Sequence, residues 1–356
     1  MQDTIRRNVP LAPLTTINLG GPARFLVVCK NEEDIRRALA LSHQENVPLH
    51  ILGGGSNTVF ADEGFQGVVA KIELKGLTFT EENETVLVSA AAGEVWDEVV
   101  QASLAKGLAG IECLSGIPGL VGATPMQNVG AYGQDVAETI EDVTTIDRRT
   151  GKSVTFTNAA CTFAYRVSRF KKEDLGTYIV TNVRFRLRRD AVPTIRYPQV
   201  QAQLEKMYGT VDIGTGQEAL EKVRETVLHL RRSKSMVVNP SDPHSRSCGS
   251  FFTNPIISAE KAKLVQATQS GQQGYTVKGG VKMSAAWLVE QAGFARGQRF
   301  GNVGISPNHS LALVNYGGTT KELLAVATTI QKKVKELFDI TLELEPVAVL
   351  PHNSVQ

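Results

Sequence analysis

Cysteine is scarce in this sequence, and the few that occur form no pattern. Cys29, Cys113, Cys161 and Cys248 lie far apart, with no C-x-x-C pair among them. This spacing excludes a zinc ribbon and gives no disulfide framework, so we expect no metal site. Cys29 and Cys161 stand in apolar segments, where a free cysteine behaves as a small buried hydrophobic residue. Cys248 is most simply a filler of the same kind, although its place just before Ser250 also allows it to tune a site or to be oxidised.

An excess of charge of either sign is also lacking. The 356 residues include 38 lysines and arginines and 36 aspartates and glutamates, for a formal net charge of +2. Proteins that bind nucleic acid or a membrane surface usually carry a concentrated basic patch. We therefore expect no nucleic-acid partner and no membrane partner, and nothing in the sequence indicates an obligate protein partner.

Long apolar runs are absent as well. No segment approaches the roughly 18 to 20 apolar residues of a membrane-spanning helix. The first residues, MQDTIRRNVPLAPL, have no apolar core behind their basic residues and do not form a signal peptide. These absences predict a soluble, cytoplasmic protein.

A chain of this length holds more than one hydrophobic core. Apolar periodicity and chain breakers divide it into four segments: 1–75, 76–215, 216–340 and 341–356. The predicted strands are 24–30, 47–52, 67–74, 85–93, a hairpin over 140–157 that turns at Thr150-Gly151, 177–189 and 340–350. The predicted helices are 31–46 with Asn31 as its cap, 94–107, 216–234 and 320–338.

Glycine, by contrast, is concentrated in two loops. GGGSN (53–57) and GIPGLVGATPMQNVGAYG (116–133) each follow an apolar strand. One glycine-rich turn is most simply a tight turn, but two of them favour two walls around one elongated anionic ligand. Neither loop contains lysine or arginine, so backbone N–H groups would supply the donors, as they do around a bound pyrophosphate.

Two familiar nucleotide-binding motifs do not fit. Thr58 stands where the Rossmann pattern G-x-G-x-x-G needs its last glycine, and no long helix follows. TGKS (150–153) imitates the end of a P-loop, but Ile146 occupies the position of that motif's first glycine and the setting is a hairpin. We reject both motifs.

Polar residues in unusual settings suggest a reactive site. Arg166 lies in a polar segment between apolar strands, and Ser250 stands beside a glycine and ahead of two aromatic residues. Glu343 and Glu345 alternate with leucines, so both are expected on one face of a strand. Each has an ordinary alternative: a surface ion pair for the arginine, a turn hydroxyl for the serine and solvent-facing acids for the glutamates.

Seven blocks of this sequence resemble, in the same order, those of the UDP-N-acetylenolpyruvoylglucosamine reductases, bacterial flavoenzymes that complete UDP-N-acetylmuramate for peptidoglycan. The blocks are NLGGPARF, ILGGGSN, GIPGLVGATPMQNVGAYG, FAYRVSRFK, GSFFTNP, SAAWLVEQAG and LELEPV. The resemblance extends from about Asn18 to about Val349. It implies an α+β protein with a two-subdomain FAD-binding fold of the vanillyl-alcohol-oxidase (PCMH) type and a C-terminal α+β substrate domain.

On this resemblance, 1–75 and 76–215 would be the two FAD-binding subdomains, 216–340 the substrate domain, and 341–356 a strand that returns to the flavin subdomains. FAD would be a non-covalent cofactor and NADPH the co-substrate. The expected cofactor-binding residues are Gly53, Gly54, Gly55, Ser56, Asn57, Ile117, Pro118, Gly119, Gly122, Ala123, Gln127, Asn128, Gly130, Ala131 and Tyr132. Whether Gln127 and Asn128 contact the cofactor or tie the loop internally is left open.

The reaction implied by the resemblance reduces the enolpyruvyl ether of UDP-N-acetylglucosamine. NADPH reduces the flavin, flavin N5 passes a hydride to the vinyl carbon, and an enolate conjugated to the substrate carboxylate develops. Arg166 would stabilise that charge, and a protonated Glu345 with a raised pKa would add a second donor. Ser250 would deliver the proton. Because Pro346 follows Glu345 directly, Glu343 stays an alternative.

Five further residues match positions that bind substrate in the family. Tyr197 occupies the place of a tyrosine on a mobile substrate loop in one branch, and the insertion around it suggests this branch. Arg231 and Lys234 match positions near the UDP and NADPH phosphates, and Asn254 and Gln291 are candidate polar contacts. The ordinary alternatives are an exposed loop tyrosine and a basic helix C-terminus.

Some alternatives remain on the sequence alone. His309 matches a family position too, but a lone histidine in an apolar run is more often structural. Another flavin oxidase of the same fold, acting on an alcohol or a sugar, would not need Arg166, Ser250 and Glu345 together. A nucleotide-sugar binding module would keep the fold without the chemistry.

Overall fold

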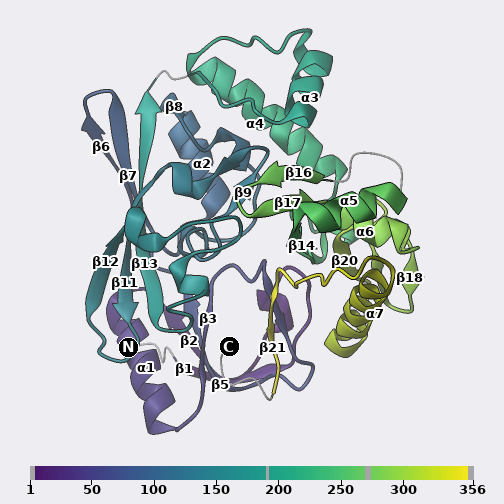
Figure 1. The fold of residues 1–356 in the computed structure, drawn as a ribbon. Coiled ribbons are helices and arrows are strands. Elements are labelled where there is room, and N and C mark those ends of the chain that lie inside the picture. The colour runs from purple at the N-terminus through teal and green to yellow at the C-terminus, as the bar shows by residue number, and fades with distance from the viewer. Residues whose placement is uncertain (1–4, 190–191, 269–273, 352–356) are drawn as a thin grey trace.

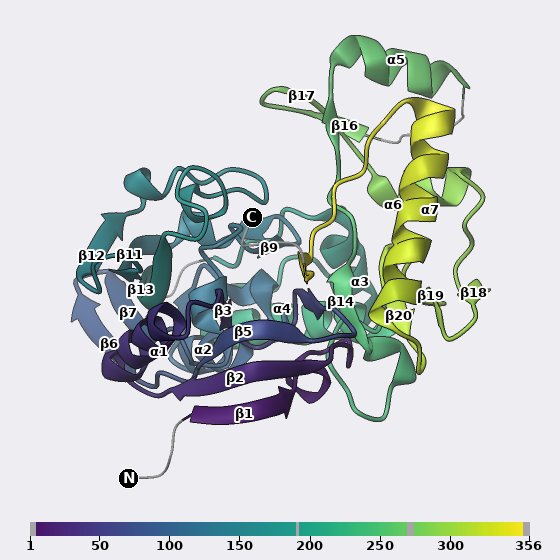
Figure 2. The same ribbon diagram turned by 90° about the horizontal axis from the view of Figure 1, so that it is seen from below.

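The computed structural model describes residues 5–189, 192–268 and 274–351 (Figures 1 and 2). Part of each of the four predicted segments therefore lies outside the described residues. Figure 1 shows two sheets on the left and a third body, green to yellow, on the right. No helix in the described ranges is long and apolar enough to cross a membrane.

The first subdomain is a four-stranded sheet in the order β1-β2-β5-β3. Its elements are β1 (Ile5–Pro10), β2 (Pro22–Cys29), α1 (Glu32–Gln44), β3 (Leu49–Leu52) and β5 (Phe65–Ile72). Strands β2, β5 and β3 are parallel, and β1 is antiparallel. The predicted cap of α1 is confirmed, because the Asn31 side chain accepts a hydrogen bond from the Asp34 N–H. Strand β3 is at one edge of this sheet, and the first glycine loop begins directly after it at Gly53.

The second subdomain is an antiparallel sheet in the order β12-β11-β13-β7-β6. Its elements are β6 (Leu77–Glu82), β7 (Thr85–Ala91), α2 (Trp96–Leu104), β8 (Leu108–Ala109), β9 (Gly130–Ala131), β10 (Gln134–Asp135), β11 (Ile140–Asp147), β12 (Ser153–Thr157) and β13 (Tyr178–Arg189). The predicted hairpin over 140–157 is confirmed as β11 and β12. Trp96 of α2 packs on Phe185 of β13, with ring centroids 5.5 Å apart, and fastens the helix to the sheet.

Two helices follow that sheet and pack on its subdomain. They are α3 (Pro198–Tyr208), which the sequence did not predict, and α4 (Gly216–Ser233). The predicted apolar stripe of α4 is buried, and it packs with α3 and with Cys113 of the second subdomain. Arg224 of α4 also pairs with Asp97 of α2 at 2.6 Å. The predicted domain boundary at residue 216 thus falls before a helix whose apolar face is buried on the second subdomain.

In its described residues, the C-terminal domain combines two small sheets and three helices. Its elements are β14 (Ser247–Ser250), β15 (Ile256–Ile257), α5 (Ala259–Thr268), β16 (Gly274–Val277), β17 (Gly280–Met283), α6 (Ala285–Gln291), β18 (Arg299–Phe300), β19 (Val303–Ile305), β20 (Ala312–Asn315) and α7 (Thr320–Phe338). The sheets have the orders β14-β20-β19-β18 and β15-β17-β16. Helix α7 has the predicted bounds, and Thr319 and Glu322 form a capping box at its start.

The C-terminal domain is fastened to the first subdomain. Its core includes Ile17, Leu19 and Val59 of that subdomain. The Asp62 carboxylate accepts the Thr320 N–H at 2.8 Å and the Lys321 N–H at 3.0 Å, and so receives two free N–H groups of the α7 N-terminus.

The end of the chain returns to the first subdomain. Strand β21 (Val347–Val349) pairs in parallel with β4 (Thr58–Phe60). The strand predicted over 340–350 is interrupted, however. Leu344 forms an isolated bridge with Phe252, the chain then bends at residues 345–346, and only β21 continues as a strand. Pro346 has no N–H for a ladder, so the chain changes partner at this position.

Candidate functional site

A cavity of about 1390 Å³ lies between the two subdomains and the C-terminal domain. Both glycine loops line it, and so do Arg166, Ser250 and Glu345, which come from distant parts of the sequence. The fold therefore gathers the two kinds of candidate residue, the bare backbone and the charged or hydroxyl side chains, around one space.

The two glycine loops touch each other. A Cβ on Gly54 would lie 2.9 Å from the Gly119 Cα, and one on Gly119 would lie 2.9 Å from Ser56 Oγ. Ser56 Oγ in turn donates to the Pro118 carbonyl at 3.1 Å. Gly55 has φ +65°, and a Cβ there would lie 2.0 Å from the Leu14 carbonyl oxygen. This close approach is open only to glycine, which accounts for the bare sequence.

Most of the predicted cofactor-binding residues line the cavity. They are Gly53, Gly54, Gly55, Ser56, Asn57, Ile117, Pro118, Gly122, Ala123, Gln127, Asn128, Gly130, Ala131 and Tyr132. Gly119 does not line the cavity, and it lies directly against the Ser56 side chain instead. Asn128 is 4% exposed; its amide donates to the Ala164 carbonyl and its oxygen accepts the Ala137 N–H, so it ties the loop internally.

The first loop presents unpaired donors to this cavity. Within the described part of the chain, no backbone N–H of residues 53–57 makes a hydrogen bond. Free N–H groups at the end of a parallel strand suit a pyrophosphate, and the cavity volume of about 1390 Å³ leaves room for a dinucleotide. The residues present therefore fit FAD.

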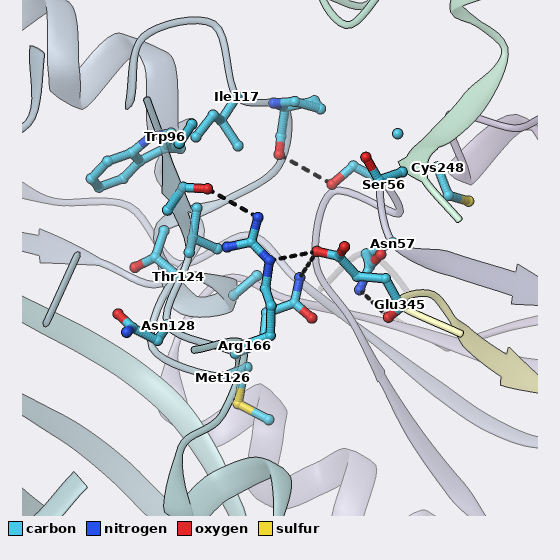
Figure 3. Close-up of a pocket in the computed structure, with 18 of the residues that line it drawn as sticks. Ser56, Asn57, Trp96, Ile117, Thr124, Met126, Asn128, Arg166, Cys248 and Glu345 are labelled. Atoms are coloured by element: carbon cyan, nitrogen blue, oxygen red, sulfur yellow. Dashed lines mark hydrogen bonds and ion pairs between the residues drawn. The ribbon is translucent and has the colours of Figure 1, made fainter. Parts of the chain in front are cut away.

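Arg166 and Glu345 form an ion pair at the cavity wall, with 2.9 Å between Nε and Oε1 (Figure 3). Arg166 Nη2 donates to the Gly130 carbonyl at 3.0 Å, and its buried Nε makes no hydrogen bond of regular geometry. Arg166 has φ +55°, an unusual conformation for a side chain of this size. The Gly130 carbonyl and the Glu345 carboxyl group thus contact the guanidinium at two different nitrogens and fix its orientation.

The Glu345 backbone is fixed by two domains. Its N–H donates to the Phe251 carbonyl at 3.0 Å, and its carbonyl accepts from Asn57 Nδ2 at 3.1 Å. Asn57 also accepts the Val347 N–H, so the chain is held on both sides of Pro346. The carboxyl group is presented to the cavity by backbone contacts rather than by a long flexible arm.

Burial raises the pKa of Glu345 above its ordinary value, against the opposing effects of Arg166 and Lys171. Glu343 differs, because it is exposed and does not line the cavity. The bend at Pro346 breaks the alternation that predicted one shared face. The structure therefore brings Glu345, and not Glu343, to Arg166.

Ser250 ends strand β14, which pairs with β20, and it lines the cavity. Its hydroxyl makes no hydrogen bond with any residue that the structure describes, so it is available to a ligand. Cys248 is 6% exposed, and burial raises the pKa of its thiol to about 12. A thiol with that pKa stays protonated and unreactive near neutral pH, which favours the filler interpretation.

The predicted substrate residues divide into two groups. Tyr197, Lys234 and Asn254 line the cavity, and Tyr197 packs edge-on against Tyr132 with ring centroids 5.7 Å apart. Arg231 also lines it but is committed to the protein, because it donates to the Gly116 carbonyl at 3.1 Å and the Met236 carbonyl at 2.8 Å.

Gln291 lies outside the cavity lining. It is the last residue of α6 and is exposed, so it does not join the other candidates at the cavity. His309 lines the cavity, where its Nδ1 accepts the Leu311 N–H. Burial and the nearby cations lower the pKa of His309 to about 4, so the ring is neutral.

Sequence reasoning missed several polar residues of the cavity. Lys171 and Tyr165 stand in the same block as Arg166, but nothing in the sequence distinguishes them from surface residues. Lys282 Nζ lies 4.2 Å from the Tyr165 ring centroid and 4.8 Å from that of Tyr275. The sequence did carry a signal for Tyr275 and Lys282, because both lie in the alternating segment YTVKGGVK, which forms the hairpin of β16 and β17.

Comparisons with known proteins agree with this geometry. Residues 23–157 match the family model of the FAD binding domain, and residues 241–349 match that of the UDP-N-acetylenolpyruvoylglucosamine reductase C-terminal domain. The UDP-N-acetylenolpyruvoylglucosamine reductase of Thermobifida fusca is 46% identical over 98% of this chain and 99% of its own length. That of Streptomyces coelicolor is 43% identical over 96% of this chain and 89% of its own length.

A solved structure shares the fold. It is the UDP-N-acetylenolpyruvylglucosamine reductase of Thermus caldophilus, with a TM-score of 0.66, 24% identity and coverage of 97% of this chain and 98% of that one. The architecture is thus the predicted two-subdomain FAD-binding fold of the PCMH type with a C-terminal α+β domain. The chain is an enzyme with FAD as its cofactor. Both glycine loops lie within the residues that match the FAD binding domain, the C-terminal domain matches its own family model, and the identity extends over nearly the full length of these relatives. The chain therefore belongs to the UDP-N-acetylenolpyruvoylglucosamine reductase family.

Proposed function

We propose that this protein reduces the enolpyruvyl ether of UDP-N-acetylglucosamine to UDP-N-acetylmuramate with NADPH, in the cytoplasm, as a step in making peptidoglycan precursors. The observation that carries the proposal is the meeting of Arg166, Glu345 and Ser250 at the cavity that the two glycine loops line. When bound, FAD supplies the hydride chemistry that links NADPH to the vinyl carbon of the substrate.

Arg166 is proposed to bind the carboxylate of the enolpyruvyl group. Its Nη2 and Nε are directed to Gly130 and Glu345, and its Nη1 has no hydrogen-bond partner among the described residues. A guanidinium that is already fixed in orientation stabilises developing enolate charge without reorganising. The same cation lies beside Glu345, whose raised pKa favours the protonated form that donates a hydrogen bond to the substrate carboxylate.

Ser250 is proposed to protonate the carbon next to the reduced one. Its hydroxyl has no partner among the described residues, so it is free to meet a substrate held by Arg166. A serine is a weak acid, and transfer of its proton is driven by the negative charge that develops on the substrate. The serine then recovers a proton from solvent.

The nucleotide part of the substrate is proposed to lie against Tyr197, Lys234 and Asn254. Lys234 Nζ bonds Gln199 Oε1 at 2.7 Å and lies 5.6 Å from the Tyr132 ring centroid, so its ammonium is positioned at the cavity margin. Arg231 contributes by holding Gly116 at the start of the second glycine loop.

The visible absorption of the purified protein under anaerobic conditions tests the proposal. We expect the flavin band to bleach when NADPH is added and to return when the enolpyruvyl substrate follows. Bleaching without return would remove the substrate assignment, and a protein that stays colourless after FAD is supplied would remove the flavin assignment as well.

A further inference from the structure

The cavity holds a lysine to which the proposed mechanism gives no role. Lys171, in the turn after Arg166, lines the cavity, and its Nζ lies 3.3 Å from Gln127 Oε1. Gln127 Nε2 lies 3.4 Å from Glu345 Oε1. Lys171, Gln127 and Glu345 thus form a row of polar contacts, which ends on the carboxyl group that is proposed to be protonated.

The order of donors along this chain is fixed by chemistry. An ammonium group only donates hydrogen bonds, so the atom of Gln127 that faces Lys171 has to be the amide oxygen. The amide NH₂ is then the end that faces Glu345. Without Lys171, the amide is able to turn over and present its oxygen to the same carboxyl group.

The two oxygens of Glu345 are consequently unlike. Oε1 faces Arg166 Nε at 2.9 Å and Gln127 Nε2 at 3.4 Å, whereas Oε2 has no partner within the described part of the chain. An oxygen that faces two donors is the acceptor of a protonated carboxyl group, and the proton belongs on the other one.

We propose that Lys171 is a positioning residue, which orients the Gln127 amide so that Oε1 of Glu345 stays an acceptor and Oε2 carries the proton toward the substrate. This inference rests on the proposed function, since it assigns the proton-bearing oxygen of that same site. Lys171 touches neither the acid nor the reacting carbon in this arrangement and acts through Gln127.

Lys171 also has a second effect, because its charge acts on the pKa of Glu345. Arg166 and Lys171 both lower the pKa of Glu345, while burial raises it. The Tyr165 hydroxyl is also coupled to Glu345, and Glu343, two residues before Glu345, raises the pKa of Lys171. Removing the Lys171 charge therefore leaves Glu345 protonated to a higher pH.

Lys171→Met and Lys172→Met form a matched pair for the test, because Lys172 is the next residue, is exposed and does not line the cavity. In the holoenzyme, stopped-flow spectroscopy follows the NADPH step and the substrate step separately across a range of pH. We expect K171M to slow the substrate step by roughly tenfold, to move its alkaline limb upward by about one pH unit, and to leave the NADPH step unchanged. K172M is expected to behave like the unmodified protein, and Lys171→Arg to restore most of the rate.

Two outcomes would overturn the inference. One is a K171M alkaline limb that coincides with that of K172M. The other is an additive loss in the pH-independent rate of the substrate step in the double variant K171M/Q127M. The charge of Lys171 moves only the alkaline limb, and a lysine that orients the Gln127 amide has no further effect on the pH-independent rate once that amide is gone. Flavin content and thermal unfolding of each variant identify one that has simply failed to fold, in which case K171R carries the test. Failure of the proposed function is distinct, because the unmodified protein would then show no substrate step at all.

Discussion

Glu345 is an acid held out of water beside a cation, and its behaviour follows from the balance between the two. Burial raises its pKa and Arg166 opposes the rise. At the scale of single residues, this makes Glu345 the group whose replacement reports most directly on the site.

Glu345→Gln keeps the shape of the side chain and removes its titration. The folded-state pKa of Glu345 lies above its ordinary value of 4.5, so its contribution to stability is fully present below that pH and falls as pH rises through the folded-state pKa. We expect the free energy of unfolding of E345Q, relative to the unmodified protein, to increase as pH rises from 4.5. Urea unfolding at a series of pH values measures it. The exposed Glu343→Gln is the control, and an equal pH trend in both variants would contradict the assignment.

Ser250 gives a second prediction at this scale. Ser250→Ala removes the free hydroxyl and leaves the glycine loops intact, so FAD content and the NADPH step should be unchanged. The substrate step should slow by at least about a hundredfold, the effect of losing a positioned proton donor. Single-turnover absorption separates the two steps. A normal substrate step in S250A would place the proton donor elsewhere.

Much of the residue-level site was predictable, and the exceptions have physical causes. Arg166, Ser250 and Glu345 were identified in advance and line one cavity, while their catalytic roles stay predictions. Lys171 was missed because a lysine in a polar turn has no pattern that distinguishes it from a solvated one. Gln291 does not line the cavity, because the position of the last residue of α6 depends on how the helix packs, which its own sequence does not specify.

At the scale of elements, the two glycine loops work as one joined structure. Gly54→Ala would place a methyl group 2.9 Å from the Gly119 Cα, where only backbone stands in its way. We expect this to cost about 1 to 3 kcal/mol of unfolding free energy, as overpacking does, and to weaken FAD binding.

Gly53→Ala is the matched control, because the nearest atom to its Cβ is Leu120 Cδ1 at 3.9 Å. Its cost should stay within about 0.5 kcal/mol. Urea unfolding of the flavin-free proteins compares the two. Equal costs would mean that the loops are able to separate without penalty.

Elements with strong periodicity were predicted well. Helix α7 has its predicted bounds and α4 buries its predicted stripe, because an amphipathic face of many residues outweighs local ambiguity. The short strands β18, β19 and β20 were not predicted, since two to four residues carry little periodic signal. Helix α3 was missed for a related reason: it buries only Val200 and Leu204.

At the scale of the whole molecule, the C-terminal domain depends on the first subdomain for the start of its longest helix. Asp62 accepts two N–H groups of α7, so Asp62→Ala should destabilise that domain by about 1 kcal/mol. Calorimetry should then show the C-terminal domain unfolding earlier, with Glu63→Ala, an exposed neighbour, unchanged. A D62A transition identical to that of E63A would show that the two bodies are joined by their apolar contacts alone.

The link between Asn57 and Glu345 joins residues that are 288 positions apart in the sequence. On the ribosome, a chain that has already produced its glycine loops and Ser250 still lacks this acid and the strand β21 that holds it. Such a contact forms late in folding, because closing a long loop costs conformational entropy before the contact contributes any stability. A nascent chain is therefore able to fold its flavin subdomains early, but it completes the proposed proton-transfer site only after residue 349 has emerged.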